Sequence, residues 1–224
     1  MKLTADLVAA SPSYINAIKE YELDLSNNHI TQLENLGSTR NLYDALNLCT
    51  NTVRVLGNFP SLPRLLSIYA SDNRIASIDR TLASSIPNIR TLVLTGNDLR
   101  ELSDLEPLRE FTQLEHLSVV GNPVASVQWA RLWCVWRFKA LKVLDFERVT
   151  ERERKEAQKV FETNGELSAL ALDILAVQQT NTFVPGEGLE EEETVDLDKQ
   201  QSIAELKARI RSEMAQIEAM DEYI

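Results

Sequence analysis

The side chains that most often carry catalysis or bind metals are few in this chain of 224 residues. It has two histidines, His29 and His116, and two cysteines, Cys49 and Cys134. Neither histidine lies in a motif that would make it the base for a nucleophile, and the cysteines are far apart without CxxC spacing. No P-loop, dinucleotide, zinc-protease or EF-hand motif occurs in the sequence. We therefore expect no enzyme, no metal, no cofactor and no small-molecule substrate.

The carboxylates indicate binding rather than catalysis. Glu22 and Asp24 alternate along a predicted strand and so share one exposed face. Acid–base catalysis would also need a pocket, whereas neighbouring carboxylates on an open strand suit a basic partner surface.

A repeat positions these residues. The pattern L-x-x-L-x-L-x-x-N-x-L fits five segments, at 20–30, 43–53, 65–75, 89–99 and 114–124. The asparagines are Asn28, Asn51, Asn73, Asn97 and Asn122, at steps of 23, 22, 24 and 25 residues. This period is typical of leucine-rich repeats. The fold class predicted is α/β, a leucine-rich-repeat solenoid with a curved parallel sheet, five repeats, helical caps and a C-terminal helical tail.

Each part of the pattern has a physical role. The L-x-L pair is a short strand whose alternate side chains point into the core. An asparagine amide carries two donors and an acceptor, so stacked asparagines can pair backbone groups of the turn that would otherwise be buried without partners. We expect these five side chains to form a structural ladder.

A solenoid needs caps, because its end repeats would otherwise expose the core. The expected organisation is an N-terminal helical cap at 1–19, repeats at 20–124, a C-terminal cap with flanking helices at 125–178, an acidic flexible linker at 179–201 and an amphipathic docking helix at 202–220. The last helix either docks on another protein or folds back weakly on its own chain.

The C-terminal cap combines a helix and a sixth strand. Trp129, Leu132, Trp133 and Trp136 recur at helical spacing and are expected to cover the core, the alternative being a ligand cage. In the strand that follows, Leu144 and Phe146 are expected to point inward.

The net charge is −11, of which residues 186–224 contribute −8 (12 acidic, 4 basic). The acidity therefore belongs mostly to the tail and says little about what the repeats bind. No run of about 18 apolar residues could span a bilayer, so no membrane association is expected.

The strand side chains that alternate with the core leucines form the concave face. We expect it to bind a partner helix with basic flanks and an apolar centre, because acidic residues lie at both ends with Tyr69 and Val93 between. The candidate contacts are Glu22, Asp24, Asn47, Tyr69, Ser71, Val93, Thr95, His116, Ser118 and Asp145.

Residues 131–159 carry nine lysines and arginines against five acids. Such a patch could contact nucleic-acid phosphates, and a solvated helix with i,i+4 ion pairs is the alternative. Base-specific RNA reading would need exposed aromatic side chains, and the sequence predicts none there. Any RNA contact should be auxiliary.

Several segments resemble the family of U2 small nuclear ribonucleoprotein A-prime subunits. They are "KLTADLV", "ELDL", "ENLG", "LGNFP", "LSVVGNPV", the cap "RLWCVWRFKALKVLDFERV", "ERKEAQKVF" and "TFVPGEGL". The resemblance implies a nuclear, non-enzymatic splicing subunit. Its concave face would hold a helix of an RNA-recognition-motif partner, the B-double-prime protein, and the pair would bind stem-loop IV of U2 small nuclear RNA.

Thr150 stands where the resemblance would place a basic residue beside the RNA. The expected RNA contacts are therefore Arg148, Arg152 and Lys155. The helix at 202–220 would contact other spliceosomal proteins. A cytosolic leucine-rich-repeat adaptor, of the phosphatase-regulator or axonemal type and without RNA, is the alternative function.

Overall fold

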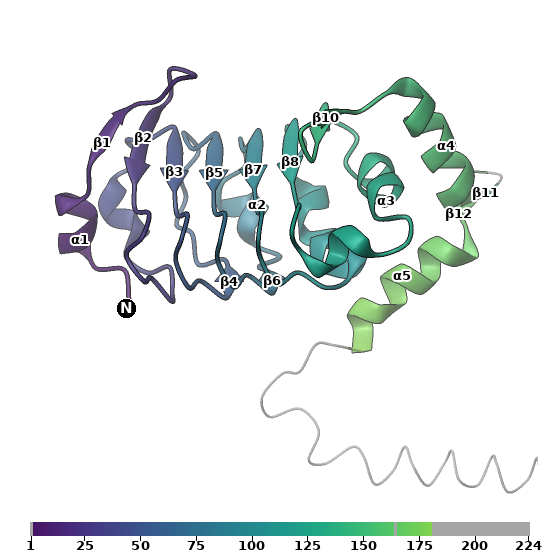
Figure 1. The fold of residues 1–224 in the computed structure, drawn as a ribbon, viewed down its shortest axis with the longest axis horizontal. Helices are drawn as coiled ribbons and strands as arrows, with labels where there is room; N and C mark the ends of the chain where they lie inside the picture. Colours follow the sequence, from purple (N-terminus) through teal and green to yellow (C-terminus); the bar gives the residue numbers. More distant parts are fainter. Residues whose placement is uncertain (1, 164, 181–224) are drawn as a thin grey trace, which may run out of the picture. The chain divides into compact units, whose positions relative to one another are not determined.

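The computed structural model describes residues 2–163 and 165–180. These residues form the predicted curved solenoid, in which one strand from each coil lines the concave side (Figure 1). Six parallel strands make up the centre of the sheet: β2 (Tyr21–Asp24), β3 (Ala45–Asn47), β5 (Ser67–Tyr69), β7 (Thr91–Val93), β8 (His116–Ser118) and β9 (Val143–Leu144). Two antiparallel strands, β1 (Ser13–Ile15) and β10 (Glu147–Arg148), close its ends.

The register of the sheet places one apolar side chain of each central strand in the core. One leucine or isoleucine of each central strand lies in a single row across the sheet, and all six are buried: Leu23, Leu46, Ile68, Leu92, Leu117 and Leu144. A one-residue slip would turn this row to solvent, so the register is strongly specified.

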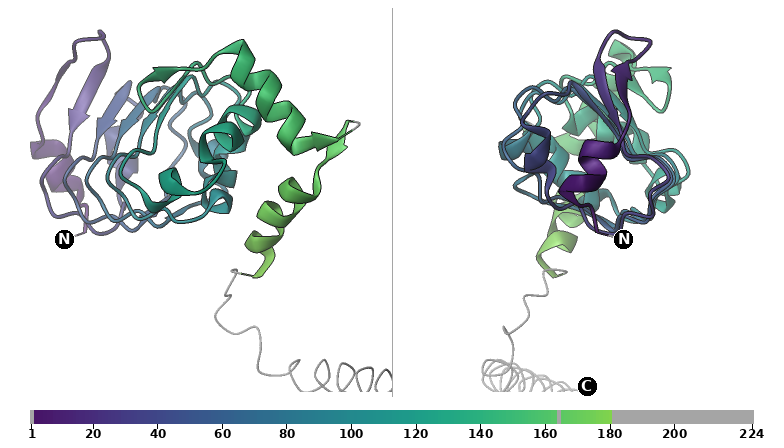
Figure 2. Two further views of the ribbon diagram at one scale, coloured as in Figure 1. Left: turned by 45° about the vertical axis from the view of Figure 1, so that its right-hand side comes forward. Right: turned by 90° about the vertical axis from the view of Figure 1, so that its left-hand side faces the viewer.

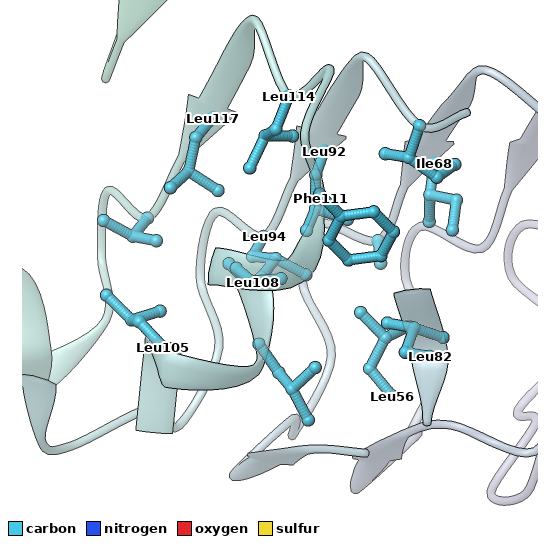
Figure 3. Packing of buried hydrophobic residues seen from close by; sticks show 14 of the residues in the cluster. Leu56, Ile68, Leu82, Leu92, Leu94, Leu105, Leu108, Phe111, Leu114 and Leu117 are labelled. Atoms are coloured by element: carbon cyan, nitrogen blue, oxygen red, sulfur yellow. The ribbon is translucent and has the colours of Figure 1, made fainter. Parts of the chain in front are cut away.

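The convex side carries short helices and one two-stranded sheet. They are η1 (Leu36–Thr39), α2 (Leu82–Ser85), η2 (Leu102–Glu110), η3 (Pro123–Ser126) and the parallel pair β4 (Val55–Leu56) and β6 (Ser77–Ile78). Figure 3 shows Leu108 of η2 beside Leu94, which follows β7, and Phe111 beside Leu92 of that strand.

The asparagine ladder forms as predicted in four of the five coils. In Asn97, for example, the side-chain oxygen accepts from Ile75 N at 2.9 Å, and Nδ2 donates to Ala70 O at 2.8 Å and Leu94 O at 2.9 Å. Each of the four amides thus joins its own turn to the preceding coil, and each is at most 8% exposed: Asn51, Asn73, Asn97 and Asn122.

Asn28 differs because no repeat precedes it. Its amide donates to Ser26 O at 2.9 Å, within its own turn, and the side chain is half-buried. The residue before each of the five repeat asparagines has a positive φ, which turns the chain after the strand; these residues are Asn27, Thr50, Asp72, Gly96 and Gly121.

The N-terminal cap is less helical than predicted. Helix α1 covers only Ala5–Ala10, with Thr4 as its N-cap, and residues 13–15 form β1 instead of continuing the helix. Pro12 after the helix favours extended backbone, and β1 then pairs with β2 as a hairpin that covers the free edge of the sheet.

The C-terminal cap contains α3 (Ala130–Arg137), β9, β10 and α4 (Glu151–Phe161). Trp133 is fully buried and packs at 5.2 Å from Trp136 and at 5.3 Å from Phe161, measured between ring centroids. This cluster supports core covering rather than a ligand cage. The helical position predicted for Trp129 is wrong, because this residue precedes α3 with φ 71° and is 40% exposed.

The inward orientation predicted for Phe146 is also wrong. The strand β9 ends at Leu144, and the chain reverses immediately into β10, so the Phe146 ring is 75% exposed.

The remaining elements are β11 (Glu162–Thr163), β12 (Glu166–Leu167) and α5 (Ala169–Thr180), which Figure 2 shows following α4. No helix among the described residues is long and apolar enough to cross a membrane. Residues 179 and 180 of the linker predicted at 179–201 belong to α5, and the rest of that linker and the helix predicted at 202–220 lie outside the described residues.

Asn97→Ala should lower the free energy of unfolding by about 3 kcal/mol, because it leaves several buried backbone groups unpaired at roughly 1–3 kcal/mol each. Chemical denaturation of the full chain measures this. Asn28→Ala, at the same place in the repeat but half-buried, is the matched control and should cost under about 1 kcal/mol. Equal losses would contradict the ladder's role.

Candidate partner-binding face

Strand pairing brings most of the predicted concave residues into two rows. The first runs across the sheet through Tyr14, Glu22, Ala45, Ser67, Thr91, His116, Val143 and Arg148. The second contains Asp24, Asn47, Tyr69, Val93 and Ser118. Ser71 and Thr95 follow the second row in their coils, and Thr95 Oγ1 lies 3.0 Å from Ser118 Oγ.

The centre of this face is partly open to solvent. The side chains of Asn47, Tyr69, Ser71, Val93 and Thr95 are all half-buried, and His116 is exposed. Six parallel strands at roughly 4.8 Å spacing give a face about 24 Å across, and an α-helix with side chains is about 10–12 Å wide. The face can therefore accept a helix.

Glu22 does not have the open position that the sequence suggested, because the N-terminal hairpin covers it. Its carboxylate accepts from Tyr14 Oη at 3.1 Å and from Asn16 Nδ2 at 3.0 Å, and the residue is 5% exposed. Glu20, in the same hairpin, accepts from Ser67 Oγ at 2.8 Å. Tyr14, Asn16 and Glu20 thus belong to this face. The sequence does not indicate them as contacts, because it predicts a helix at 1–19 instead of the hairpin.

The N-terminal half of the face has a negative field. Burial raises the pKa of the Tyr69 phenol, and the Glu20 and Glu22 carboxylates raise it further. Burial likewise raises the pKa of the Cys49 thiol, with contributions from Asp72 and Glu22. Both groups are therefore neutral at pH 7, and the charge on this half is carried by carboxylates.

The other end of the face carries both an acidic residue, the half-buried Asp145, and a basic one, Arg148. Asp145 accepts from Val119 N at 2.7 Å and lies 3.4 Å from Ser118 Oγ, so it supports the turn of the cap. Ser118 is itself 3% exposed. Beyond Val143 the first row ends in Arg148, so this end has a cation that the N-terminal end of the row, Tyr14 and Glu22, lacks.

The basic patch separates into structural and free cations. Arg131 pairs with Glu153 at 2.7 Å, Arg137 pairs with Glu106, and Arg154 donates to the carbonyl oxygens of Val135 and Leu141. In contrast, Arg148, Arg152 and Lys155 make no salt bridge within the part of the chain that the structure describes. Arg148 and Lys155 are exposed, and Arg152 is also open to solvent.

Thr150, at the position where the resemblance implies a basic residue, has a structural role. It is the N-cap of α4: its Oγ1 accepts from Glu153 N, and the Glu153 carboxylate accepts from Thr150 N and Oγ1, both at 2.8 Å. This capping box fixes the start of the helix that carries Arg152 and Lys155.

Among residues 2–163 and 165–180, no group of acidic, histidine or cysteine side chains is arranged to hold a metal ion.

Comparisons with known proteins agree with this architecture. A leucine-rich-repeat family model matches residues 1–174. The U2 small nuclear ribonucleoprotein A′ of Aspergillus fumigatus is 42% identical over 190 residues, which cover 85% of this chain and 75% of the relative. This chain belongs to the U2 small nuclear ribonucleoprotein A′ family. The human member is 40% identical over 190 residues, which cover 84% of this chain and 73% of the relative.

A solved structure also matches. It is a chain of the Drosophila melanogaster SNF/U2A′ complex, with a TM-score of 0.73 and 41% sequence identity, covering 79% of this chain and 99% of that chain. The family assignment made from the cap and repeat segments is therefore confirmed, and the chain is a leucine-rich-repeat subunit of U2 small nuclear ribonucleoprotein type.

Glu153→Gln should destabilise the cap in a pH-dependent way. Arg131 and Thr150 lower the pKa of Glu153 from 4.5 to about 2. A depressed folded-state pKa means that the carboxylate stabilises the fold at neutral pH and that this contribution is lost as the pH falls from 4.5 toward 2. We expect Glu153→Gln to lower Tm at pH 7 and the difference from the parent chain to shrink on acidification.

Thermal unfolding between about pH 7 and about pH 2.5 measures this difference, because that range spans the titration of a depressed carboxyl. The control is Glu156→Gln on the exposed side of the same helix, which should leave Tm unchanged at both ends of the range. A constant deficit for Glu153→Gln at all pH values would show that the ionised carboxylate is not the stabilising species.

Proposed function

We propose that the concave face binds an α-helix of an RNA-recognition-motif protein of the B-double-prime kind. The observation that carries this proposal is the polarised, partly open face, with Tyr69 and Val93 between the carboxylates of the first coils and Arg148 at the cap. A helix with an apolar stripe and basic residues toward the first coils complements it. The Drosophila U2A′ structure was solved as a complex with SNF, which supports an assembly of this type.

The pair of proteins then binds stem-loop IV of U2 small nuclear RNA, in the nucleus, as part of pre-mRNA splicing. Support comes from the family and from the three cations Arg148, Arg152 and Lys155, whose charges are available for phosphates. In this arrangement the partner reads the RNA loop, and the solenoid adds phosphate contacts and positions the partner. Proteins in this role act as scaffolds and need no catalytic pocket.

Tyr69→Arg combined with Val93→Arg should reduce binding of the partner at least about tenfold, because two cations then face a basic helix in place of apolar contacts. Isothermal titration of the full chain with the recombinant partner measures the affinity. Val55→Arg, an exposed apolar position on the convex strand β4, is the matched control. Unchanged affinity in the double variant would exclude the concave face.

Arg152→Ala combined with Lys155→Ala should weaken RNA binding by the two-protein complex and reduce the slope of log K against log salt by about 1–2. Arg74→Ala combined with Arg80→Ala, exposed arginines of the repeats, is the control and should leave the slope unchanged.

RNase treatment of complexes purified with the full chain separates this function from that of a cytosolic adaptor, whose partners would remain bound.

A further inference from the structure

The β9–β10 turn carries an aromatic side chain in an unfavourable backbone conformation. Leu144 pairs with Glu147, so the hairpin loop has two residues, Asp145 and Phe146. Their φ angles are 52° and 65°, as in a type I′ turn. The second position of this turn favours glycine, because a side chain in the left-handed region collides with the backbone.

Packing does not compensate for this conformation. The Phe146 ring is 75% exposed, more than any other large apolar side chain among the described residues. Of the described residues with positive φ, the only other phenylalanine, tyrosine or tryptophan is Trp129, which is 40% exposed. Most of the others are polar, and asparagine and aspartate tolerate the left-handed region well. The position therefore combines backbone strain with an exposed ring.

The turn is held on a rigid support. Asp145 Oδ1 accepts from Val119 N at 2.7 Å, which fixes the turn against the end of β8. On the other side, the Arg131 guanidinium donates to Leu144 O at 3.1 Å and pairs with Glu147 at 3.5 Å. The Phe146 ring is thus presented from a fixed backbone rather than from a loose loop, and little ordering entropy is lost when it contacts a ligand.

Free cations follow the ring directly in the chain. Arg148 extends from β10 opposite Val143, and α4 then brings in Arg152 and Lys155. Asp145 and Glu147, the acidic neighbours of Phe146, are both engaged, with Val119 N and with Arg131. An exposed aromatic ring beside unpaired cations is the combination that binds an unpaired nucleotide, with the base on the ring and the phosphates on the cations.

We propose that Phe146 stacks on an unpaired base of the bound RNA, while Arg148 contacts the adjacent phosphate. The inference rests on the proposed RNA-binding function and gives it a defined base-contacting site. It also revises the sequence-based expectation that this region has no exposed aromatic side chain. Stacking requires only the flat face of a base, so the contact tolerates different sequences but requires an unpaired nucleotide.

The test uses the full chain in complex with its partner and a fluorescently labelled stem-loop IV RNA. Phe146→Gly removes the ring and relieves the backbone strain, so its Tm should equal or exceed that of the parent. We expect it to weaken RNA binding about fivefold or more, within the range measured for loss of a stacked base. Phe146→Leu, which is apolar but has no π face, should lose as much.

Two controls retain the affinity if the proposal holds. Phe146→Trp keeps a stacking surface and should bind within about twofold of the parent. Ile18→Ala removes an exposed apolar side chain, 61% exposed, from the N-terminal end of the solenoid and should have no effect. A blunt duplex of the same length has no unpaired base and should bind the parent and Phe146→Gly equally.

Three results would overturn the proposal. These are an unchanged RNA affinity for Phe146→Gly, an equal loss on the blunt duplex, and a loss of partner affinity in the absence of RNA, which would make Phe146 a protein contact. Failure of the parent complex to bind the stem-loop at all would instead overturn the proposed function, and this inference with it.

Discussion

The whole fold depends on pairing the backbone where each coil leaves the sheet. After each of the repeat strands β2, β3, β5, β7 and β8 the chain turns sharply through a residue with positive φ, and the turn leaves peptide groups inside the molecule. Asn51, Asn73, Asn97 and Asn122 satisfy those groups and join each coil to the one before it. Because the strands pair with one another and the ladder pairs the turns, the concave side of the sheet needs no covering layer and can serve as a binding surface.

The caps determine which charged side chains lie at the two ends of that surface. The N-terminal hairpin places Glu20 beside Ser67 and covers Glu22, so negative charge is concentrated over the first coils. The C-terminal cap uses Asp145 for its turn and ends the sheet with Arg148. This end of the surface therefore has a cation that the first coils lack. In the proposed assembly, a partner with an uneven charge distribution would be favoured in one orientation, and the RNA would lie at the end that carries Arg148.

The repeats could be predicted from the sequence because a fixed pattern encodes them. Leu92 and Asn97 recur at the same places in each coil, and one physical role explains each place. The caps follow no such period. The hairpin at 13–24 and the reversal after Leu144 depend on contacts between distant residues, such as Asp145 with Val119, that no local pattern indicates. For this reason the sequence does not predict the buried position of Glu22 or the exposed ring of Phe146. Composition indicates a basic patch at 131–159, whereas the choice of Arg152 and Lys155 within it rests on the family resemblance.

In the proposed assembly the concave face, and not the convex side, receives the partner helix. Site-specific photo-crosslinking tests it most directly, with a benzophenone amino acid in place of Tyr69 or, for comparison, in place of Val55 of the full chain. We expect the probe that replaces Tyr69 to crosslink to a helix of the RNA-recognition-motif partner and the probe that replaces Val55 not to do so. Crosslinking from the Val55 site with none from the Tyr69 site would contradict it.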